Sequence, residues 1–166
     1  MTILYFFTDG SVDPGSKNGF GAYFVLKESP DSIEVIEPKI EIRKFEDTSS
    51  TRLEVQTFLW AIAQVDPSGE RVVIYTDCQN LIGLQGRRSR FESANYVSRK
   101  GNRLSNADLY QQFFEIVDRV SCQFIKVQGH KRTNKKDKID LFFSFVDKAS
   151  RKALRDYMKL KSELNN

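Results

Sequence analysis

The sequence has few of the residues that build disulfide frameworks or membrane spans. It contains two cysteines among 166 residues, Cys78 and Cys122, and neither has a metal-ligand partner nearby in the chain. Two cysteines are too few for a disulfide framework. No apolar run approaches the roughly 20 residues that cross a bilayer, and Met1 leads into a strand-like segment without a signal-type leader. We therefore expect a reducing, cytoplasmic setting and no attachment to a membrane.

The chain also lacks internal repeats, low-complexity segments and linkers. A length of 166 residues corresponds to about one domain and is enough to bury one core. We predict a single domain over residues 1–166.

Charge is unevenly distributed along the chain. Residues 1–83 carry 7 lysines and arginines against 13 acids, whereas residues 84–166 carry 19 against 9. The basic half indicates a polyanionic partner, although solvated helix faces are the common alternative for such runs. Two basic clusters lie next to segments with candidate catalytic residues, and this position favours nucleic acid as the partner. The clusters are Arg87, Arg88 and Arg90, then Lys131, Arg132, Lys135, Lys136 and Lys138.

Two buried strands each end in a Thr-Asp pair. The apolar run Ile-Leu-Tyr-Phe-Phe stops at Thr8-Asp9, and Val-Val-Ile-Tyr stops at Thr76-Asp77. Continuous apolar runs of this length are typical of strands buried on both faces, and open α/β sheets bind ligands beyond the carboxyl ends of such strands. If the two strands are parallel neighbours, Asp9 and Asp77 point into one site.

Periodicity predicts the remaining elements. We expect strands over 20–26, 33–43, which alternates apolar and charged residues, and 124–127. We expect helices from a cap among residues 47–51 to an end at Asp66, from a cap at Asn106 to about 120, and from about 135 to 160. A short helical or loop stretch should start at Gln79, and an irregular basic segment should cover 86–103.

Four acids therefore fall at the ends of elements. They are Asp9, Glu54 in the first turn of the first long helix, Asp77, and an aspartate on the last helix. Taken singly, each acid is explained by a turn or by the helix dipole. Together in one cleft they would repel unless a divalent cation held them, and oxygen ligands of this kind suit Mg²⁺, with Mn²⁺ as a further possibility.

Five motifs in order resemble those of type 1 ribonuclease H, over nearly the whole chain. They are Thr8-Asp9-Gly10-Ser11 with Gly19-Phe20-Gly21-Ala22, Ser49-Ser50-Thr51-Arg52-Leu53-Glu54, Thr76-Asp77-Cys78-Gln79, Asn106-Ala107-Asp108-Leu109-Tyr110, and Lys126-Val127-Gln128-Gly129-His130. The resemblance implies a mixed five-stranded sheet with helices on both faces. It also implies hydrolysis of the RNA strand of RNA·DNA hybrids to 5′-phosphate products by two metal ions.

The same resemblance assigns roles to individual residues. Asp9 would bridge both metal ions, and Glu54 and Asp77 would complete their shells. Gln79 and Ser50 would contact the minor groove, where 2′-hydroxyls mark RNA, while Ser49 and Arg52 would contact a phosphate of the DNA strand. Arg87, Arg88 and Arg90 would partly replace the basic handle of other members. His130, the one histidine, would shuttle a proton or assist product release rather than be an ordinary surface imidazole.

The last acid of the site has two candidates. Asp140 lies ten residues after His130, a common spacing in the family, whereas Asp147 begins the pattern Asp-Lys-Ala-Ser-Arg-Lys-Ala. Seven residues are two helical turns, so both acids share one face. We favour Asp147, with Asp140 as the alternative and otherwise as a surface acid near the helix start.

Two other functions remain open from the sequence. A non-catalytic module that binds hybrid or double-stranded RNA would keep the basic half without needing all the acids. A DNA-directed nuclease of the same superfamily would keep the acids without needing Gln79 and Ser50. For the enzyme that cleaves RNA·DNA hybrids we expect a monomer.

Overall fold

A computed structural model describes residues 2–128 and 137–166 and contains one mixed sheet of five strands. The strands are β1 (Ile3–Asp13), β2 (Asn18–Leu26), β3 (Glu41–Phe45), β4 (Arg71–Thr76) and β5 (Ser121–Lys126), in the order β3-β2-β1-β4-β5. β1, β2 and β3 form an antiparallel meander, and β4 and β5 run parallel to β1. This arrangement confirms the predicted mixed five-stranded sheet.

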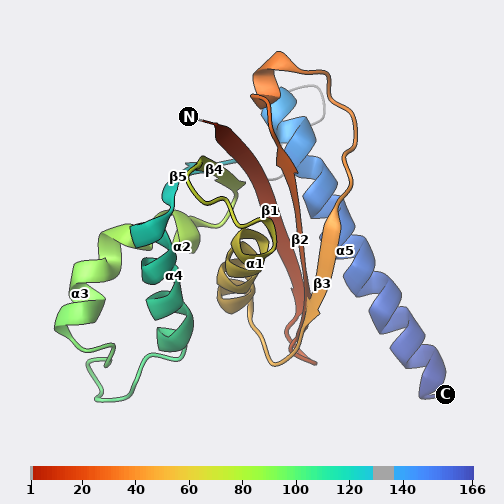
Figure 1. Cartoon of the computed structure of the whole chain (residues 1–166). Coiled ribbons are helices and arrows are strands. Elements are labelled where there is room, and N and C mark those ends of the chain that lie inside the picture. Colours follow the sequence, from red (N-terminus) through yellow and green to blue (C-terminus); the bar gives the residue numbers. More distant parts are fainter. Residues whose placement is uncertain (1, 129–136) are drawn as a thin grey trace.

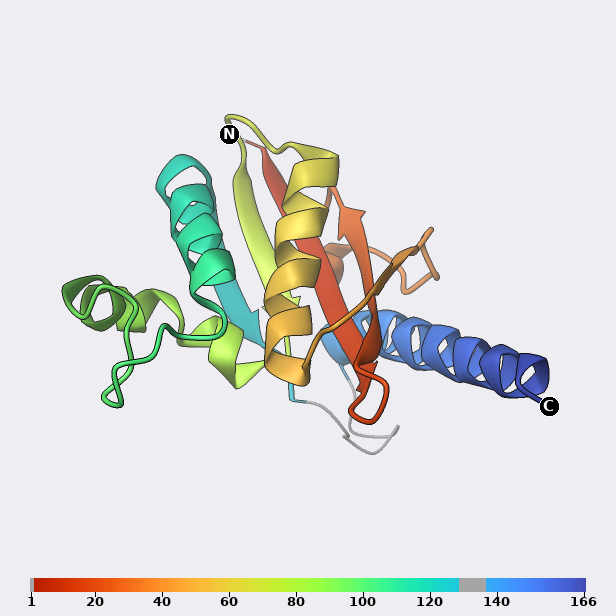
Figure 2. The ribbon, with the colours of Figure 1, turned by 90° about the horizontal axis from the view of Figure 1, so that it is seen from below.

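Helices cover both faces of the sheet, as predicted (Figures 1 and 2). The helices are α1 (Ser50–Val65), α2 (Gln79–Ile82), α3 (Arg88–Ser93), α4 (Ala107–Arg119) and α5 (Lys138–Leu164), with short 3₁₀ turns at Pro30–Ser32 and Gln85–Arg87. α1 and α4 pack together on one face, and α5 crosses the other face along β1 and β2.

The sheet divides the buried residues into two clusters. Because side chains alternate along a strand, Phe6 enters the cluster under α1 and α4, whereas the adjacent Phe7 enters the one under α5. Phe7 stacks on Tyr75 with ring centroids 4.6 Å apart and lies 5.8 Å from the ring of Phe142 on α5. β1 is therefore held from both sides at the point where it approaches Asp9.

The strand predicted over residues 33–43 is only partly correct. Ladder pairing with β2 begins at Glu41, and residues 33–40 have no regular structure. Ile33, Val35 and Ile40 still pack against the α5-side core, whereas Ile42, which was predicted on the same face, is 44% exposed. Pro38 has no backbone N–H to donate, which explains why the alternating segment does not join the ladder as a whole.

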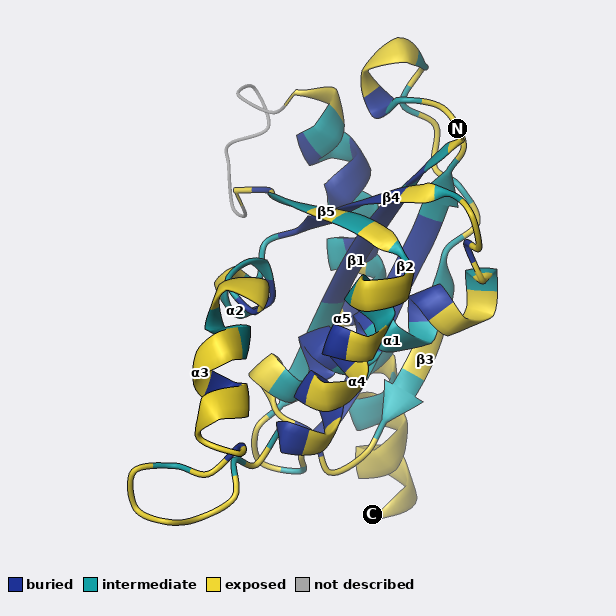
Figure 3. Cartoon of the chain, turned by 60° about the vertical axis from the view of Figure 1, so that its left-hand side comes forward, coloured by how far each residue is buried: buried dark blue, intermediate teal, exposed yellow. Residues whose placement is uncertain are grey.

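The basic segment 86–103 is also more regular than expected. It includes the short helix α3, after which residues 94–106 form an exposed loop that projects from one side of the molecule (Figure 3). A bridge between Val97 and Arg103 and the bond from Ser98 N–H to the carbonyl of Asn102, 2.7 Å, close a small hairpin in this loop.

The last helix starts later and ends later than the predicted range of 135–160. α5 begins with a capping box. The Asp137 carboxylate accepts a hydrogen bond from the Asp140 N–H at 2.8 Å, and the Asp140 carboxylate accepts one from the Asp137 N–H at 3.3 Å. Its C-terminal turns pass beyond the sheet (Figures 1 and 2). Within the described residues, no helix combines the length and the apolar character required to span a bilayer.

Candidate active site

Asp9 and Asp77 lie opposite each other where the parallel pairing of β1 and β4 ends. The two strands pair from Ile3–Arg71 to Phe7–Tyr75 with a constant offset of 68 residues. The same offset places Asp9 across from Asp77, two residues beyond the last pair. The sheet therefore brings together the two aspartates that the strand-end pattern predicted.

Glu54 reaches the same point because α1 packs unusually close to the first two strands. A Cβ atom at Gly10 would lie 2.8 Å from the Leu53 side chain, and one at Gly21 would lie 2.2 Å from the Thr57 hydroxyl. Larger residues at these positions would push α1 outward. Glu54 lies between Leu53 and Thr57 on the buried face of α1, so the glycines determine how near its carboxylate comes to Asp9.

The three carboxylates form a compact group that fits a divalent cation. One oxygen from each of Asp9, Glu54 and Asp77 lies within 4.8 Å of the others. Asp9 and Glu54 are 4% and 7% exposed, and Glu54 Oε2 is buried without a hydrogen-bond partner among the described residues. A buried carboxylate oxygen aimed into an acidic cluster is costly unless a cation or proton compensates it.

The electrostatics of the group point the same way. Burial, followed by repulsion from Asp77, raises the pKa of Asp9 to about 8. Burial and then the charge of Asp9 raise the pKa of Glu54 well above its usual range. The raised pKa values mean that the charged forms of these carboxyls are disfavoured unless a cation is bound, and hard oxygen donors in this number suit Mg²⁺ or Mn²⁺.

Of the two candidate aspartates on α5, the structure brings Asp147 to the cluster. The charge of Asp147 and an interaction between the two side chains contribute to the raised pKa of Asp9, so the two carboxyl groups lie close together. One turn further, the Ser150 and Ser11 hydroxyls lie 3.2 Å apart and tie α5 to β1. Arg151 also pairs with Asp147 at 2.9 Å.

Asp140 lies near the start of α5, as predicted, but it is buried. It is 7% exposed, so it is not a surface acid, and it is the third helical residue in the capping box with Asp137. Seven residues along a helix correspond to about 10 Å, which separates Asp140 from Asp147 by that distance along α5. The predicted role of His130 falls on residues 129–136, outside the described part of the chain.

Comparison with known proteins assigns the family. The RNase H family profile matches residues 1–146. The chain belongs to the ribonuclease H family. Curated ribonuclease H proteins from Moorella thermoacetica and Clostridium botulinum are 25% and 24% identical, over 84% of this chain and 88% and 92% of theirs. The protein is accordingly a ribonuclease H, an enzyme of a family that acts on RNA·DNA hybrids and uses divalent metal ions.

Solved structures show the same fold. A type 1 RNase H with a type 2 active-site motif, LC9-RNase H1, superposes with a TM-score of 0.71 at 16% identity, covering 92% of this chain and 72% of that one. A foamy viral protease–reverse transcriptase in complex with double-stranded DNA gives 0.61 at 10% identity, covering 90% and 93%. At these identities the likeness concerns the fold.

The predicted phosphate contacts of this ribonuclease H lie together in a shallow pocket of about 760 Å³. Ser49 caps α1 by accepting the Arg52 N–H at 3.2 Å, and both residues line the pocket, while Ser50 is exposed beside them. The Arg52 guanidinium already bonds both carboxylate oxygens of Asp108, at 3.0 and 3.2 Å. Asp108 was not expected to hold Arg52, although it lies in the motif that opens α4.

Gln79, the predicted minor-groove contact, is exposed at the start of α2 and close to the acids. Its Oε1 accepts a hydrogen bond of 2.9 Å from the Lys126 ammonium at the end of β5. A lysine can only donate, so this bond holds the carbonyl oxygen toward Lys126 and leaves the Gln79 amide N–H groups for other acceptors. Sequence reasoning missed Lys126, because its proximity depends on the pairing of Thr76 with Lys126 between β4 and β5.

Arg87 and Arg88, which were predicted to contact nucleic acid, form hydrogen bonds and ion pairs with other residues of this chain. Arg87 donates to the backbone carbonyls of Asn80 and Gly83 and to the Asn80 side chain, which closes the C-terminal end of α2. Arg88 bonds both Asp118 and Glu92. Arg90 is exposed, with its guanidinium 5.6 Å from the Phe91 ring centre. Of the three, only Arg90 is described without an acidic or carbonyl partner.

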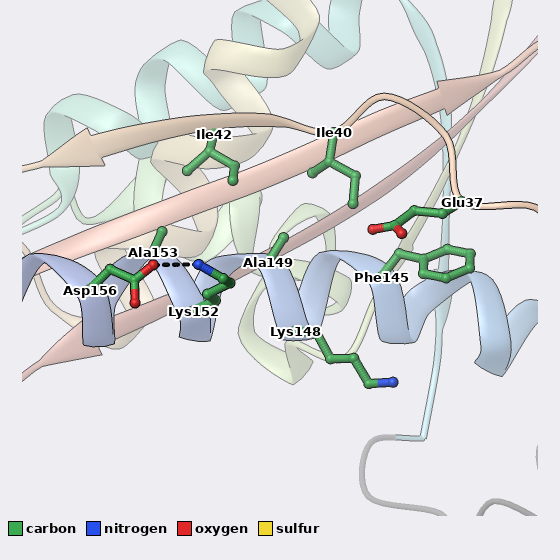
Figure 4. Close-up of a pocket in the computed structure, with 9 residues that line it drawn as sticks. All are labelled: Glu37, Ile40, Ile42, Phe145, Lys148, Ala149, Lys152, Ala153 and Asp156. Carbon is green, nitrogen blue, oxygen red and sulfur yellow. Dashed lines mark hydrogen bonds and ion pairs between the residues drawn. The ribbon is translucent and has the colours of Figure 1, made fainter.

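A separate groove of about 560 Å³ lies between α5 and the segment leading into β3. Its walls are Ile40, Ile42, Phe145, Ala149 and Ala153, with charged residues at the rim (Figure 4). The Lys152–Asp156 ion pair crosses one side of it. Neither the three clustered acids nor Asp147 line this groove, so it is separate from the acidic cluster described above.

Proposed function

We propose that this ribonuclease H hydrolyses the RNA strand of RNA·DNA hybrids to 5′-phosphate products with two divalent ions, Mg²⁺ by preference, as a monomer with one domain over residues 1–166. The observation that carries the proposal is the buried cluster of Asp9, Glu54 and Asp77, whose ligand oxygens lie within 4.8 Å of one another. Its position at the ends of two parallel strands is the usual place for ligands in open α/β sheets.

The chain's own residues would hold the ions and orient the substrate. Asp9 belongs to the compact group with Glu54 and Asp77, and the charge of Asp147 also acts on its carboxyl, so Asp9 is the residue that would hold both ions. Asp147, which is half-buried and pairs with Arg151, would complete the set. When bound, two such ions activate a water molecule and stabilise the leaving 3′ oxygen.

Recognition of the hybrid would be divided between two sides of the cluster. The amide N–H groups of Gln79 and the exposed Ser50 would donate to acceptors and 2′-hydroxyls in the minor groove. The pocket lined by Ser49 and Arg52 would take a phosphate of the DNA strand, with Arg52 already oriented by Asp108. We also propose His130 as the proton shuttle, from its motif position.

The deciding experiment compares three labelled duplexes, an RNA·DNA hybrid, double-stranded RNA and double-stranded DNA, each with Mg²⁺ or with a chelator. We expect cleavage of the RNA strand of the hybrid alone, with 5′-phosphate ends and only with the metal. Binding of hybrid without cleavage under every metal tested would support a non-catalytic module, and cleavage of double-stranded DNA would support a DNA-directed nuclease.

A further inference from the structure

The C-terminal part of α5 extends well beyond the matched family region and is strongly basic. The family match ends at residue 146, whereas α5 continues to Leu164. Between residues 147 and 161 there are six lysines and arginines and two aspartates, and all six cations are exposed: Lys148, Arg151, Lys152, Arg155, Lys159 and Lys161. We call residues 148–164 the α5 arm.

The arm starts at the active site and is firmly anchored. Tyr157 packs on Phe20 with ring centroids 5.7 Å apart and its hydroxyl bonds Lys44 at 3.0 Å, and Met158 contacts Ser16 in the β1–β2 turn. These contacts hold the helix to the sheet for three turns after Asp147. The cations of the arm are therefore carried on a rigid element, with little backbone entropy left to lose on binding.

One row of side chains leads from the catalytic acids along the arm. Residues four apart form a continuous ridge on a helix, and the ridge that starts at Asp147 continues through Arg151, Arg155 and Lys159. Arg151 is paired with Asp147, but Arg155 and Lys159 form no salt bridge with any residue in 2–128 or 137–166. Their charges are available to a partner.

The position of the arm complements the exposed loop at residues 94–106. The two project to opposite sides of the molecule, with the sheet between them (Figures 1 and 2). A duplex whose RNA strand enters the acid cluster can extend over the arm on one side only. From Asp147 to Lys159 the helix rises about 18 Å, which is the length of about five base pairs at 3.4 Å per nucleotide.

We propose that the α5 arm binds the phosphate backbone of the hybrid on one flank of the cleavage site, through Arg155 and Lys159. This inference rests on the proposed function for the position of the substrate. The partner of the arm should be a polyanionic duplex, because the ridge is basic and leads away from the site where the duplex is cut. Hydrolysis itself does not require the arm.

The test uses the double variant Arg155→Gln and Lys159→Gln, which keeps helix-forming residues and changes the charge by two. The matched control is Lys39→Gln with Arg71→Gln, both exposed and outside the active site, with Arg71 at the opposite end of β4. Circular dichroism and thermal melting verify that both variants fold. Binding is measured with chelator present, and cleavage with Mg²⁺.

The substrates carry a short block of ribonucleotides within a DNA strand, so that the cut position is fixed. Flanks of about ten base pairs exceed the five that the arm spans, and each flank is trimmed in turn. On the long duplex we expect the arm variant to bind roughly ten-fold more weakly at 0.15 M salt, with a salt slope shallower by about 1.4 to 1.8. Trimming one particular flank should abolish the difference, and trimming the other should preserve it.

Each outcome separates the arm from the active site. If the arm variant and its control bind the duplex equally well, the proposal that the arm binds phosphates is wrong, and the basic face of the arm contacts only solvent. A difference that persists after both flanks are trimmed would also overturn it. If the wild type cleaves no duplex, the proposed function is wrong. The dependence of binding on each flank then still tests whether the α5 arm binds the duplex.

Discussion

Replacing Asp9 by Asn should stabilise the metal-free protein while abolishing Mg²⁺-dependent cleavage. Burial and the neighbouring carboxylates raise the pKa of Asp9 from 3.8 to about 8. Between these values the folded state binds more protons than the unfolded state, so the wild-type free energy of unfolding falls as pH rises through this window. The Asn side chain carries no charge to repel Glu54 and Asp77 and avoids that loss.

The gain can be placed on a scale. From 3.8 to pH 7 is about three pH units, and each unit corresponds to about 1.4 kcal/mol, so the variant gains up to about 4 kcal/mol at pH 7. For a chain of this size that is on the order of 10 °C in melting temperature. At pH 4 the advantage should almost disappear, because Asp9 is protonated in the folded wild type.

The assay is thermal unfolding from pH 4 to pH 8 with chelator, then at pH 7 with Mg²⁺ or Mn²⁺. Divalent ions should raise the wild-type melting temperature and should affect the Asn variant much less. Glu28→Gln, which removes an exposed carboxylate two residues beyond β2, is the control and should not reproduce the gain in stability. An Asn variant that is no more stable than wild type at pH 8 in chelator would refute the reasoning.

Three further experiments test the rest of the site. Asp147→Asn should lower Mg²⁺-dependent turnover by orders of magnitude, whereas Asp140→Asn should cost about 1 kcal/mol of stability through the capping box and leave turnover near wild type; the opposite ranking in steady-state kinetics would move the fourth acid to Asp140. Lys126→Met should lower kcat/KM several-fold, but not in a Gln79→Ala background, and additive effects in this double-mutant cycle would show that Lys126 does not act through Gln79. Arg87→Gln should lower the melting temperature without changing the salt slope of hybrid binding, and a slope shallower by about 0.7 to 0.9 would instead identify a phosphate contact.

The strand ends were the most informative part of the sequence. A continuous apolar run that stops at Thr-Asp indicates a buried strand and a polar residue at its carboxyl end, and Asp9 and Asp77 follow from this local rule. The helical spacing after Ser49 likewise predicted α1 with Glu54 in its first turns. These features could be predicted from the sequence because each depends on side chains that are only a few residues apart in the chain.

Pairing and ladder formation were less predictable. The alternation over residues 33–43 indicated the buried side of Ile33, Val35 and Ile40 but not the exposure of Ile42, and the ladder with β2 begins only at Glu41, after Pro38. Arg87 and Arg88 were assigned to nucleic acid from their charge, whereas their partners, Asn80 and Asp118, lie on other elements. A charge in a sequence does not reveal whether the fold has already paired it.

By itself the sequence determined the order of the elements, the two faces of the sheet and which acids stand at element ends, because these depend on residue type and local spacing. Only the tertiary structure decided that a 68-residue register sets Asp9 opposite Asp77, that Gly10 and Gly21 admit α1 closely enough for Glu54, and that Asp147 rather than Asp140 approaches Asp9. Those distances depend on how distant segments of the chain pack together, and this packing depends on contacts among all the residues of the core.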